Sequence, residues 1–402
     1  MVVLSSNDGC VVARSNEAKA LGIPMGAPAF KYRDIFRSQG VVKFSANFEL
    51  YGDISQRITR VLTSITPRTE VYSVDESFLD LSQLEIDDYG QWGRRVATRI
   101  QQQIGLPVSI GLAPSKTLAK LAAEHVKKQP SLNGALDFMT QPAQRQQYLQ
   151  QTPISSIWGI GWRLTPKLRA EGIHTALAVS QLRPQFAQQL MGIHGRQLVA
   201  ELNGTACHAL APIHKVRQSI MCGRTFGEDT TQFSVVEAAI ANLSARACFR
   251  LRREGLLARQ AVLSLSSNRK KPDYQQIHRV IKLKQPTADS GRLTTQLIQI
   301  LADNFRPDML HHRANIGLYD LIAQEGLQPD LFGEVNLATA HTSQARMAAV
   351  DSLNGRYGKG TLRFAAEDLS QAWKPKHALG SPRYTTQWQE LPIIQSRRIQ
   401  TP

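Results

Sequence analysis

Two adjacent acids, Asp75 and Glu76, are the residues of this sequence best suited to chemistry. The run from Val71 to Leu81 has an apolar, strand-like arm on each side of them, which predicts a β-hairpin with both carboxylates at its turn. Carboxylate oxygens are the hard ligands that divalent cations prefer, and two such ions can catalyse phosphoryl transfer. Acidic turns are also common as plain solvated loops, so the acids alone leave both interpretations open.

The segments after this hairpin predict the layer that supports it. Apolar spacing predicts a helix over residues 92–104, residues 107–112 have the pattern of a strand, and Ser115 caps a helix that runs through Ala123. A strand pair, helix, strand and helix make up most of a βαββαβ ferredoxin-like unit, of which the first strand has no counterpart here. Upstream, Ser15 and Gly22 mark the start and end of a short helix.

Glycine-flanked turns punctuate residues 153–204, where they precede short helices. One is Gly159-Ile160-Gly161, and a second spans 191–195, so the segment resembles two helix-hairpin-helix copies. Such a turn exposes backbone N–H groups at a helix N-terminus, which can hold a phosphate without reading bases. A single G-x-G is equally consistent with an ordinary helix-stopping turn.

The positive charge is concentrated in the later part of the chain. The net charge is +16, and residues 1–130 hold 16 Lys and Arg against 13 Asp and Glu, which leaves a net +13 for residues 131–402. Residues 215–313 carry 17 basic against 8 acidic side chains, and Lys282 and Lys284 are spaced to share one face of a strand. This pattern favours binding to nucleic-acid phosphates, although a solvated basic surface would produce the same counts.

Length and composition indicate a folded protein of several domains. At 402 residues the chain exceeds one ordinary core, its hydrophobic content is 42%, and no apolar run is long enough to cross a membrane. The N-terminus lacks the features of a signal peptide, so we expect a cytoplasmic protein without a membrane partner. Four scattered cysteines predict neither a disulfide framework nor a zinc site.

Several strings together resemble the UmuC branch of the Y-family translesion DNA polymerases. Residues 72–80, YSVDESFLD, are similar to the palm signature of that family, and residues 7–22, 44–51 and 111–122 are similar to its fingers segment and last palm elements. The resemblance implies that Asp75 and Glu76 are catalytic and bind two Mg²⁺ ions. It also places Lys19 and Lys127 where the family presents lysines to the incoming triphosphate.

The same resemblance implies an α/β multidomain right hand. Its segments would be fingers at 1–50, a ferredoxin-like palm without its first strand at 51–150, a helix-hairpin-helix thumb at 151–212, a DNA-binding α/β little finger at 213–322 and a C-terminal tail at 323–402. The implied function is error-prone translesion synthesis in the SOS response, as the UmuC-like catalytic subunit of a DNA polymerase V. Implied partners are primer-template DNA, deoxynucleoside triphosphates, a sliding clamp, a UmuD-type dimer and a recombinase filament.

One departure from the family pattern concerns the metal ligands. The family begins its palm with a strand that carries a further metal-binding Asp and an aromatic steric gate against ribonucleotides, and this sequence starts after both. We therefore expect residues 1–402 alone to be inactive or nearly so, unless another carboxylate, with Asp80 the nearest, completes the site. Two hypotheses stay open: a template-directed polymerase, or a non-catalytic DNA- and clamp-binding relic. A nucleotide cyclase would share the acids but not the glycine turns or the basic segment.

A short peptide after the basic segment has the form Gln-x-x-Leu-Phe. Gln328, Leu331 and Phe332 are similar to the peptide by which bacterial polymerases dock on the sliding clamp. Two adjacent hydrophobes in a polar stretch suit an extended peptide that anchors in a pocket. The alternative is that Leu331 and Phe332 pack on their own domain.

Replacement of Leu331 and Phe332 together by alanine is predicted to abolish clamp binding, because the two side chains would be the buried anchors of the peptide. Retention on immobilised clamp measures this effect, and DNA affinity without clamp should stay unchanged. The matched control is Asp330→Ala in the same peptide. Equal retention of the double variant and the control would reduce the motif to a chance match.

Overall fold

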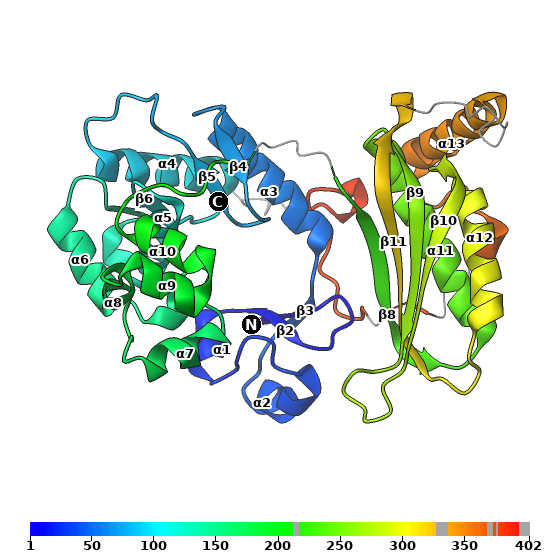
Figure 1. Ribbon diagram of the computed structural model, residues 1–402, viewed down its shortest axis with the longest axis horizontal. Coiled ribbons are helices and arrows are strands. Elements are labelled where there is room, and N and C mark those ends of the chain that lie inside the picture. The colour runs from blue at the N-terminus through cyan, green and yellow to red at the C-terminus, as the bar shows by residue number, and fades with distance from the viewer. Residues whose placement is uncertain (212–216, 327–336, 368–372, 375–376, 394–402) are drawn as a thin grey trace, which may run out of the picture. The chain divides into compact units, whose positions relative to one another are not determined.

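The computed structural model describes residues 1–211, 217–326, 337–367, 373–374 and 377–393 (Figure 1). The contacts between residues group the chain into two compact units. One contains residues 1–47 and 216–382, and the other contains residues 48–215 and 383–402. Among the described residues no helix is long and apolar enough to cross a membrane.

The N-terminal part of the first unit is a small three-stranded sheet with the order β2-β1-β3. β1 (Val2–Leu4) pairs antiparallel with β2 (Val11–Arg14) and parallel with β3 (Lys43–Ser45). The sheet packs on α1 (Asn16–Ala20) and α2 (Arg33–Ser38) through a core that includes Val2, Val11 and Phe36. The predicted helix start at Ser15 is confirmed, because its side chain accepts the N–H of Ala18 at 3.4 Å.

A segment from the far end of the chain lies along this small sheet. The N–H of Ser45 donates to the carbonyl of Leu379 at 2.8 Å, and the N–H of Leu379 donates back to the Ser45 hydroxyl at 3.0 Å. Asn47 donates to the Ser381 carbonyl and to the Pro382 carbonyl, both at 3.2 Å. We call residues 377–382 the C-terminal strap, because they extend the sheet beside β3.

The rest of the first unit is a four-stranded antiparallel sheet covered on one face by two helices. The strand order is β10-β9-β11-β8, and the connections within the unit run from β8 through α11 and from β10 through α12. The bounds are β8 (Ile220–Thr230), α11 (Phe233–Arg253), β9 (Leu256–Ser266), β10 (Gln276–Thr287), α12 (Ser290–Asn304) and β11 (His311–Ala323).

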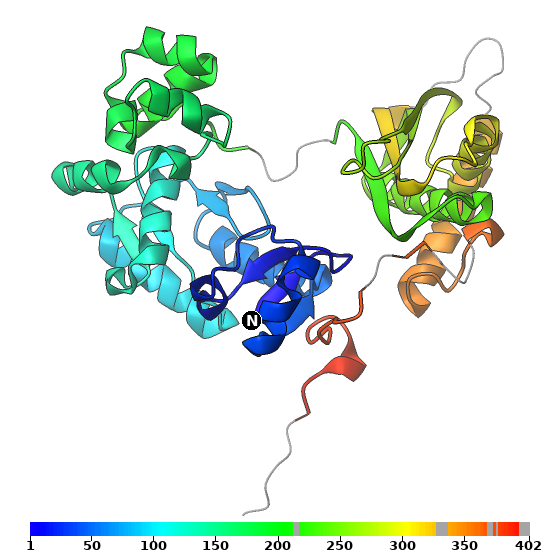
Figure 2. The ribbon, with the colours of Figure 1, turned by 90° about the horizontal axis from the view of Figure 1, so that it is seen from below.

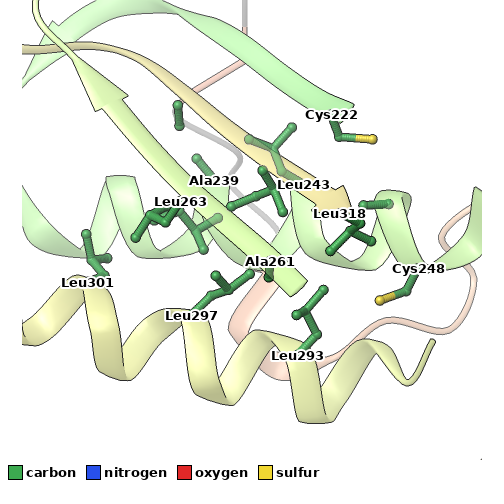
Figure 3. Packing of buried hydrophobic residues seen from close by; sticks show 14 of the residues in the cluster. Cys222, Ala239, Leu243, Cys248, Ala261, Leu263, Leu293, Leu297, Leu301 and Leu318 are labelled. Atoms are coloured by element: carbon green, nitrogen blue, oxygen red, sulfur yellow. The ribbon is translucent and has the colours of Figure 1, made fainter. Parts of the chain in front are cut away.

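The core of this part lies between the sheet and the helices. Figure 3 shows Leu293, Leu297 and Leu301 spaced every four residues along α12 and pointing toward Ala261 and Leu263 of β9. All five are almost completely buried, which is the packing expected of one apolar helix face on a sheet. Cys222 and Cys248 are buried free thiols at the same core.

A further helix, α13 (Leu337–Tyr357), is held beside α11 and α12 by charged contacts. Arg252 of α11 binds the Asp351 carboxylate of α13 through two nitrogens, each at 2.7 Å. Figure 2 shows α13 next to α11. The buried Asp289 caps α12 and also accepts hydrogen bonds from Ser343 and Arg346. Such charge-assisted and bidentate hydrogen bonds fix geometry more strongly than neutral ones, so α13 has a defined position on this part.

The second unit begins with α3 and contains the predicted acidic hairpin. β4 and β5 pair antiparallel in the register Thr69↔Leu79, Glu70↔Phe78 and Val71↔Ser77, which confirms the hairpin. The bounds of the elements up to residue 151 are α3 (Phe48–Thr63), β4 (Thr69–Val71), β5 (Ser77–Leu79), α4 (Tyr89–Ile104), β6 (Ile110–Leu112), α5 (Lys116–Lys128), β7 (Ala135–Asp137) and α6 (Pro142–Gln151).

The order of these elements agrees with the ferredoxin-like expectation, and two details differ. Within the described residues the strands form two separate ladders, β4-β5 and parallel β6-β7, each three residue pairs long, rather than one sheet. The predicted cap at Ser115 is confirmed, but α5 continues to Lys128, five residues beyond the predicted end. The extension keeps Val126 buried on the same apolar face as Leu118 and Leu121.

Gly111 explains how closely α5 packs on β6. A Cβ atom at this position would lie 2.0 Å from the carbonyl oxygen of Ala119 and 2.6 Å from the backbone nitrogen of Ala123. Only glycine allows that approach without displacing the helix. The position of α5 against the strands therefore depends on Gly111.

Four short helices follow and share a core with α5 and β7. They are α7 (Leu164–Ala170), α8 (Ala176–Ser180), α9 (Pro184–Met191) and α10 (Ile193–Leu202). Leu118 of α5, Phe138 after β7, Ile154, Leu168 and Leu202 belong to one buried cluster. The segments predicted to be palm and thumb are therefore joined by one common hydrophobic core.

Candidate active site and nucleic-acid surface

Asp75 and Glu76 lie in the loop between β4 and β5, and both are exposed. The N–H groups of Tyr72 and Ser73 each donate to the Glu76 carbonyl at 3.0 Å, which closes the turn. The Ser73 hydroxyl donates to the Asp75 carboxylate at 2.6 Å. The local hydrogen bonds thus hold the turn in one shape and leave both carboxylates open to solvent.

Lys120 is the side chain that the structure brings to these acids. Its Nζ atom lies 2.6 Å from a carboxylate oxygen of Glu76. The ammonium also sits over two rings, 4.8 Å from the centroid of Tyr72 and 5.4 Å from that of Trp158. The sequence reasoning missed this residue, and the only local signal was a lysine four residues after Lys116 on the helix that follows β6.

The acids have the right chemistry for Mg²⁺ but do not complete a site for two ions. Among the described residues, no group of three or more His, Cys, Asp or Glu side chains could hold a metal. Asp80, the nearest further acid in sequence, follows the far end of β5 and binds Arg68 at 2.6 Å. Asp75 and Glu76 can therefore supply part of a ligand set, while the described residues do not supply the rest.

A buried carboxylate fixes the base of this site. Glu201 of α10 is fully buried and accepts the N–H of Thr117 at 2.9 Å and the N–H groups of Cys207 and His208 at 2.6 and 3.2 Å. Its carbonyl accepts the Ser115 hydroxyl at 2.6 Å. Burial would raise the pKa of Glu201, but the three N–H donors outweigh it and hold the pKa below its ordinary value.

A second carboxylate, Glu70, ties the same region together from the hairpin. Glu70 pairs with Lys116, and it accepts the N–H of Ala211 at 2.9 Å. Lys116 in turn donates to the carbonyl of Ala209 at 2.8 Å and lies over the ring of Phe78. The chain that leaves the last thumb helix is thus bound directly to the acidic hairpin.

Both lysines predicted to face the triphosphate are exposed. Lys19 is exposed on α1 of the first unit, where its ammonium donates to Asn16 at 3.0 Å. Lys127 is exposed in the last turn of α5, seven residues and about 10 Å along the helix from Lys120. Their role with a nucleotide stays a prediction, and within the second unit it is Lys120 that contacts Glu76.

In the glycine turn before α7, the two glycines are exposed and the isoleucine between them is buried. Gly159 has a φ of +93°, and both Gly159 and Gly161 are exposed with open space where a Cβ would lie. Ile160 between them is buried in the core, and its N–H already donates to the Ile157 carbonyl at 3.0 Å. The backbone of the two glycines, rather than Ile160, is therefore the part of this turn open to a phosphate.

The second glycine turn joins two helices directly, as the helix-hairpin-helix expectation requires. α9 ends and α10 begins at Gly192, which has a φ of +73°. A Cβ at Gly195 would lie 2.3 Å from the Ala187 carbonyl oxygen, so a small residue is needed where the two helices approach each other.

Lys282 and Lys284 lie on the face of the four-stranded sheet that the helices leave open. Both are exposed on β10, and the intervening Leu283 is buried, which confirms that the two lysines share one face. In register, Lys282 is paired with Gln260 of β9, which is paired in turn with Tyr319 of β11. Gln328, Leu331 and Phe332, the predicted clamp peptide, lie outside the described residues.

This fold is that of solved Y-family DNA polymerases. A chimera of the polymerases Dbh and Dpo4 superposes with a TM-score of 0.62 over 80% of this chain and 92% of that chain, at 21% identity. A post-insertion binary complex of Dbh gives a TM-score of 0.51 with the same coverage and 20% identity. At these identities the likeness concerns the fold, which is a right hand with palm, fingers, thumb and little finger.

Similarity in sequence gives more specific information on the family than similarity in fold. The chain is 36% identical to UmuC of Salmonella typhimurium over 97% of its own length and 93% of that protein, and 35% identical to ImpB of Salmonella typhimurium over 98% and 93%. DNA polymerase IV of Pelotomaculum thermopropionicum is 28% identical over 88% of this chain and 85% of that protein.

The chain belongs to the impB/mucB/samB family, as a UmuC-like member of the Y-family DNA polymerases. The model of that family matches residues 1–124, and the model of its C-terminal domain matches residues 217–331. A third model, described as a domain of unknown function, matches residues 344–394, which include most of α13 and the C-terminal strap. By family the protein is a DNA-directed DNA polymerase.

Glu201→Gln is predicted to lower the free energy of unfolding by about 2–4 kcal/mol, because the buried network loses its negative charge and one of its two accepting oxygens becomes an NH2 donor. Because the pKa of Glu201 is lowered in the folded protein, its contribution is complete above about pH 5 and is lost as the pH falls through the folded-state pKa. Urea unfolding between pH 7 and pH 3 should therefore show the gap between wild type and variant closing toward low pH. Glu171→Gln, an exposed glutamate of the same unit, is the control, and a gap that does not change with pH would contradict this account.

Proposed function

We propose that this protein carries out template-directed DNA synthesis past damaged bases, as part of an SOS-type response. The observation that carries the proposal is the exposed Asp75–Glu76 turn, inside the matched family region and bonded through Lys120 to the helix that supports it. Membership of the UmuC-like family supports the polymerase chemistry. A DNA substrate of this kind favours a cytoplasmic location.

In this proposal the chain's own residues position the reacting groups. Glu76 is oriented by Lys120, Asp75 is oriented by Ser73, and the shared palm and thumb core keeps both fixed relative to the glycine turns. Such positioning lowers the barrier because the groups need not reorganise during the reaction. The exposure of the hairpin turn leaves room for a distorted template base.

We infer that the reaction requires Mg²⁺, with Asp75 and Glu76 among its ligands. Two exposed carboxylates are the donors that Mg²⁺ takes most readily. Because the described residues supply no third acid to this group, any remaining protein ligand must come from outside it. The bound ions would supply charge neutralisation for the triphosphate.

The proposed substrates and partners follow from surface chemistry and family. Primer-template DNA would lie on the open sheet face with Lys282 and Lys284 and on the turn at Gly159 and Gly161, and Lys19 and Lys127 would face the deoxynucleoside triphosphate. The peptide with Gln328, Leu331 and Phe332 would dock on a sliding clamp. A UmuD-type dimer and a recombinase filament are proposed from family membership alone.

A second candidate function is DNA and clamp binding without catalysis. One observation favours it: within the described residues, Asp75 and Glu76 are the only acids gathered at the hairpin turn, and they form no metal-binding group of three. The two candidates share every DNA contact and differ in one measurement, which is magnesium-dependent primer extension.

For the polymerase candidate, in which a further carboxylate completes the metal site, Asp75→Asn and Glu76→Gln are each predicted to lower primer extension over a damaged template by at least about a hundredfold, since each removes a carboxylate ligand. DNA affinity should stay within about twofold, because these acids do not contact phosphates. Asp87→Asn, an exposed acid of the same unit, is the control. Absence of any extension by the unmodified 402 residues, together with intact DNA binding, would favour the non-catalytic candidate.

DNA binding is predicted to be indifferent to sequence and steeply dependent on salt. The combined change Lys282→Ala and Lys284→Ala should reduce the slope of log affinity against log salt by about 2, because each phosphate contact contributes about 0.9. Arg253→Ala with Arg306→Ala removes the same charge from the exposed last residue of α11 and from an exposed position in the loop after α12, and serves as the control. Equal slopes for the two double variants would remove the open sheet face from the DNA site.

A further inference from the structure

We propose that Trp158 is a positioning residue for DNA synthesis, which holds Glu76 in place through Lys120 and links it to the glycine turn of the thumb. The inference deepens the proposed polymerase function and rests on it. It is based on the observation that one indole ring contacts the acidic hairpin, Lys120 of α5 and the chain that leaves α10. No feature of the sequence around Trp158 predicts these contacts.

The first set of contacts is with the hairpin. The Nε1–H of Trp158 donates to the Tyr72 hydroxyl at 3.1 Å, and the two rings meet edge to face with centroids 5.5 Å apart. The Phe78 centroid lies 6.0 Å from that of Trp158. Tyr72 precedes Asp75 by three residues and Phe78 follows Glu76 by two, so Trp158 packs on both arms that carry the acids.

The second contact is with Lys120. Its ammonium lies 5.4 Å from the Trp158 centroid and 4.8 Å from the Tyr72 centroid, and both rings attract a cation. Because the same ammonium is 2.6 Å from Glu76, the rings fix one partner of the ion pair.

This confinement of Lys120 decides whether the ion pair can orient Glu76. A pair between two long, freely moving surface side chains contributes little, because both must be ordered for one weak contact. Here the side chain of Lys120 is only 21% exposed and is already held by rings, whereas that of Glu76 is 46% exposed. Lys120 has thus lost most of its conformational freedom before it pairs with Glu76. The ion pair can therefore hold the carboxylate in one position.

The third link is covalent. Trp158 directly precedes Gly159, and the neighbouring Ile157 and Ile160 are both buried in the shared palm and thumb core. The His208 ring lies 5.5 Å from Trp158 on the chain that leaves α10. A phosphate held at the Gly159 turn and the carboxylate at Glu76 are therefore connected through a single side chain whose backbone cannot move freely.

The test compares Trp158→Ala, Trp158→Phe and Trp388→Ala in the full chain. Trp388 lies in the same unit, outside the glycine turns, and is 84% exposed, so it is the control for loss of an indole. Trp158→Ala is expected to lower the maximal rate of single-nucleotide insertion by about ten- to a hundredfold, with less than threefold change in DNA affinity and in the nucleotide concentration for half-maximal rate. Trp158→Phe, which keeps a ring, is expected to recover most of the rate, and Trp388→Ala is expected to keep it. An unchanged rate in Trp158→Ala, or a loss of DNA affinity equal to the loss of rate, overturns the proposal.

A second measurement separates this inference from the proposed function, because it does not need activity. Among the contacts of the described structure Trp158 has none with the Glu76 carboxylate, and Lys120 touches both side chains, so their effects should couple mainly through Lys120. The shift of the urea midpoint in the double variant Trp158→Ala with Glu76→Gln is expected to differ from the sum of the two single shifts. When Lys120→Met is also present, the double shift is expected to equal that sum. If the wild type inserts no nucleotide, the polymerase proposal fails and this cycle alone decides. Additive midpoints in the presence of Lys120 would then overturn the role of Trp158.

Discussion

The buried carboxylate of Glu201 is the interaction on which the second unit depends. It accepts three backbone N–H groups, one at the start of α5 and two in the chain after α10, and its own carbonyl accepts the Ser115 cap. A buried charge without such donors would be strongly unfavourable, so the network must form as a whole. Its formation sets where α5 begins, and α5 carries both lysines that reach the acidic hairpin.

Packing of α5 against its neighbours then positions the other residues of the site. The Gly111 contact brings α5 against β6, and the shared core packs the helices that follow α6 against α5. Lys116 and Lys120, one helical turn apart, then pair with Glu70 on β4 and with Glu76 in the turn of the same hairpin. The exposed acids are thereby placed by elements that are themselves buried, which is how a rigid scaffold presents a solvent-facing site.

The parts of this site that the sequence predicted are those with local signals. The hairpin around Asp75 follows from alternating apolar arms, and the start of α5 follows from a serine cap, and both are confirmed. The end of α5 at Lys128 was missed because tertiary packing of Val126 extends the helix. Glu201 and Lys120 were missed because their partners lie 84 and 44 residues away, so no local pattern marks them. Likewise, a G-x-G pattern cannot reveal that Ile160 is buried.

The C-terminal strap has a consequence for how the protein is made. Its hydrogen bonds to Ser45 and Asn47 join residues 334 apart in the chain, and Ala378 donates to Asp8 across 370 residues. A ribosome adds about 5–20 residues per second, so the small N-terminal sheet leaves the exit tunnel roughly 15–70 s before the strap that borders β3. During that interval the edge of β3 is an unpaired strand, a surface prone to pairing with other chains. Translation rate and chaperone cover thus become part of the folding of this subdomain.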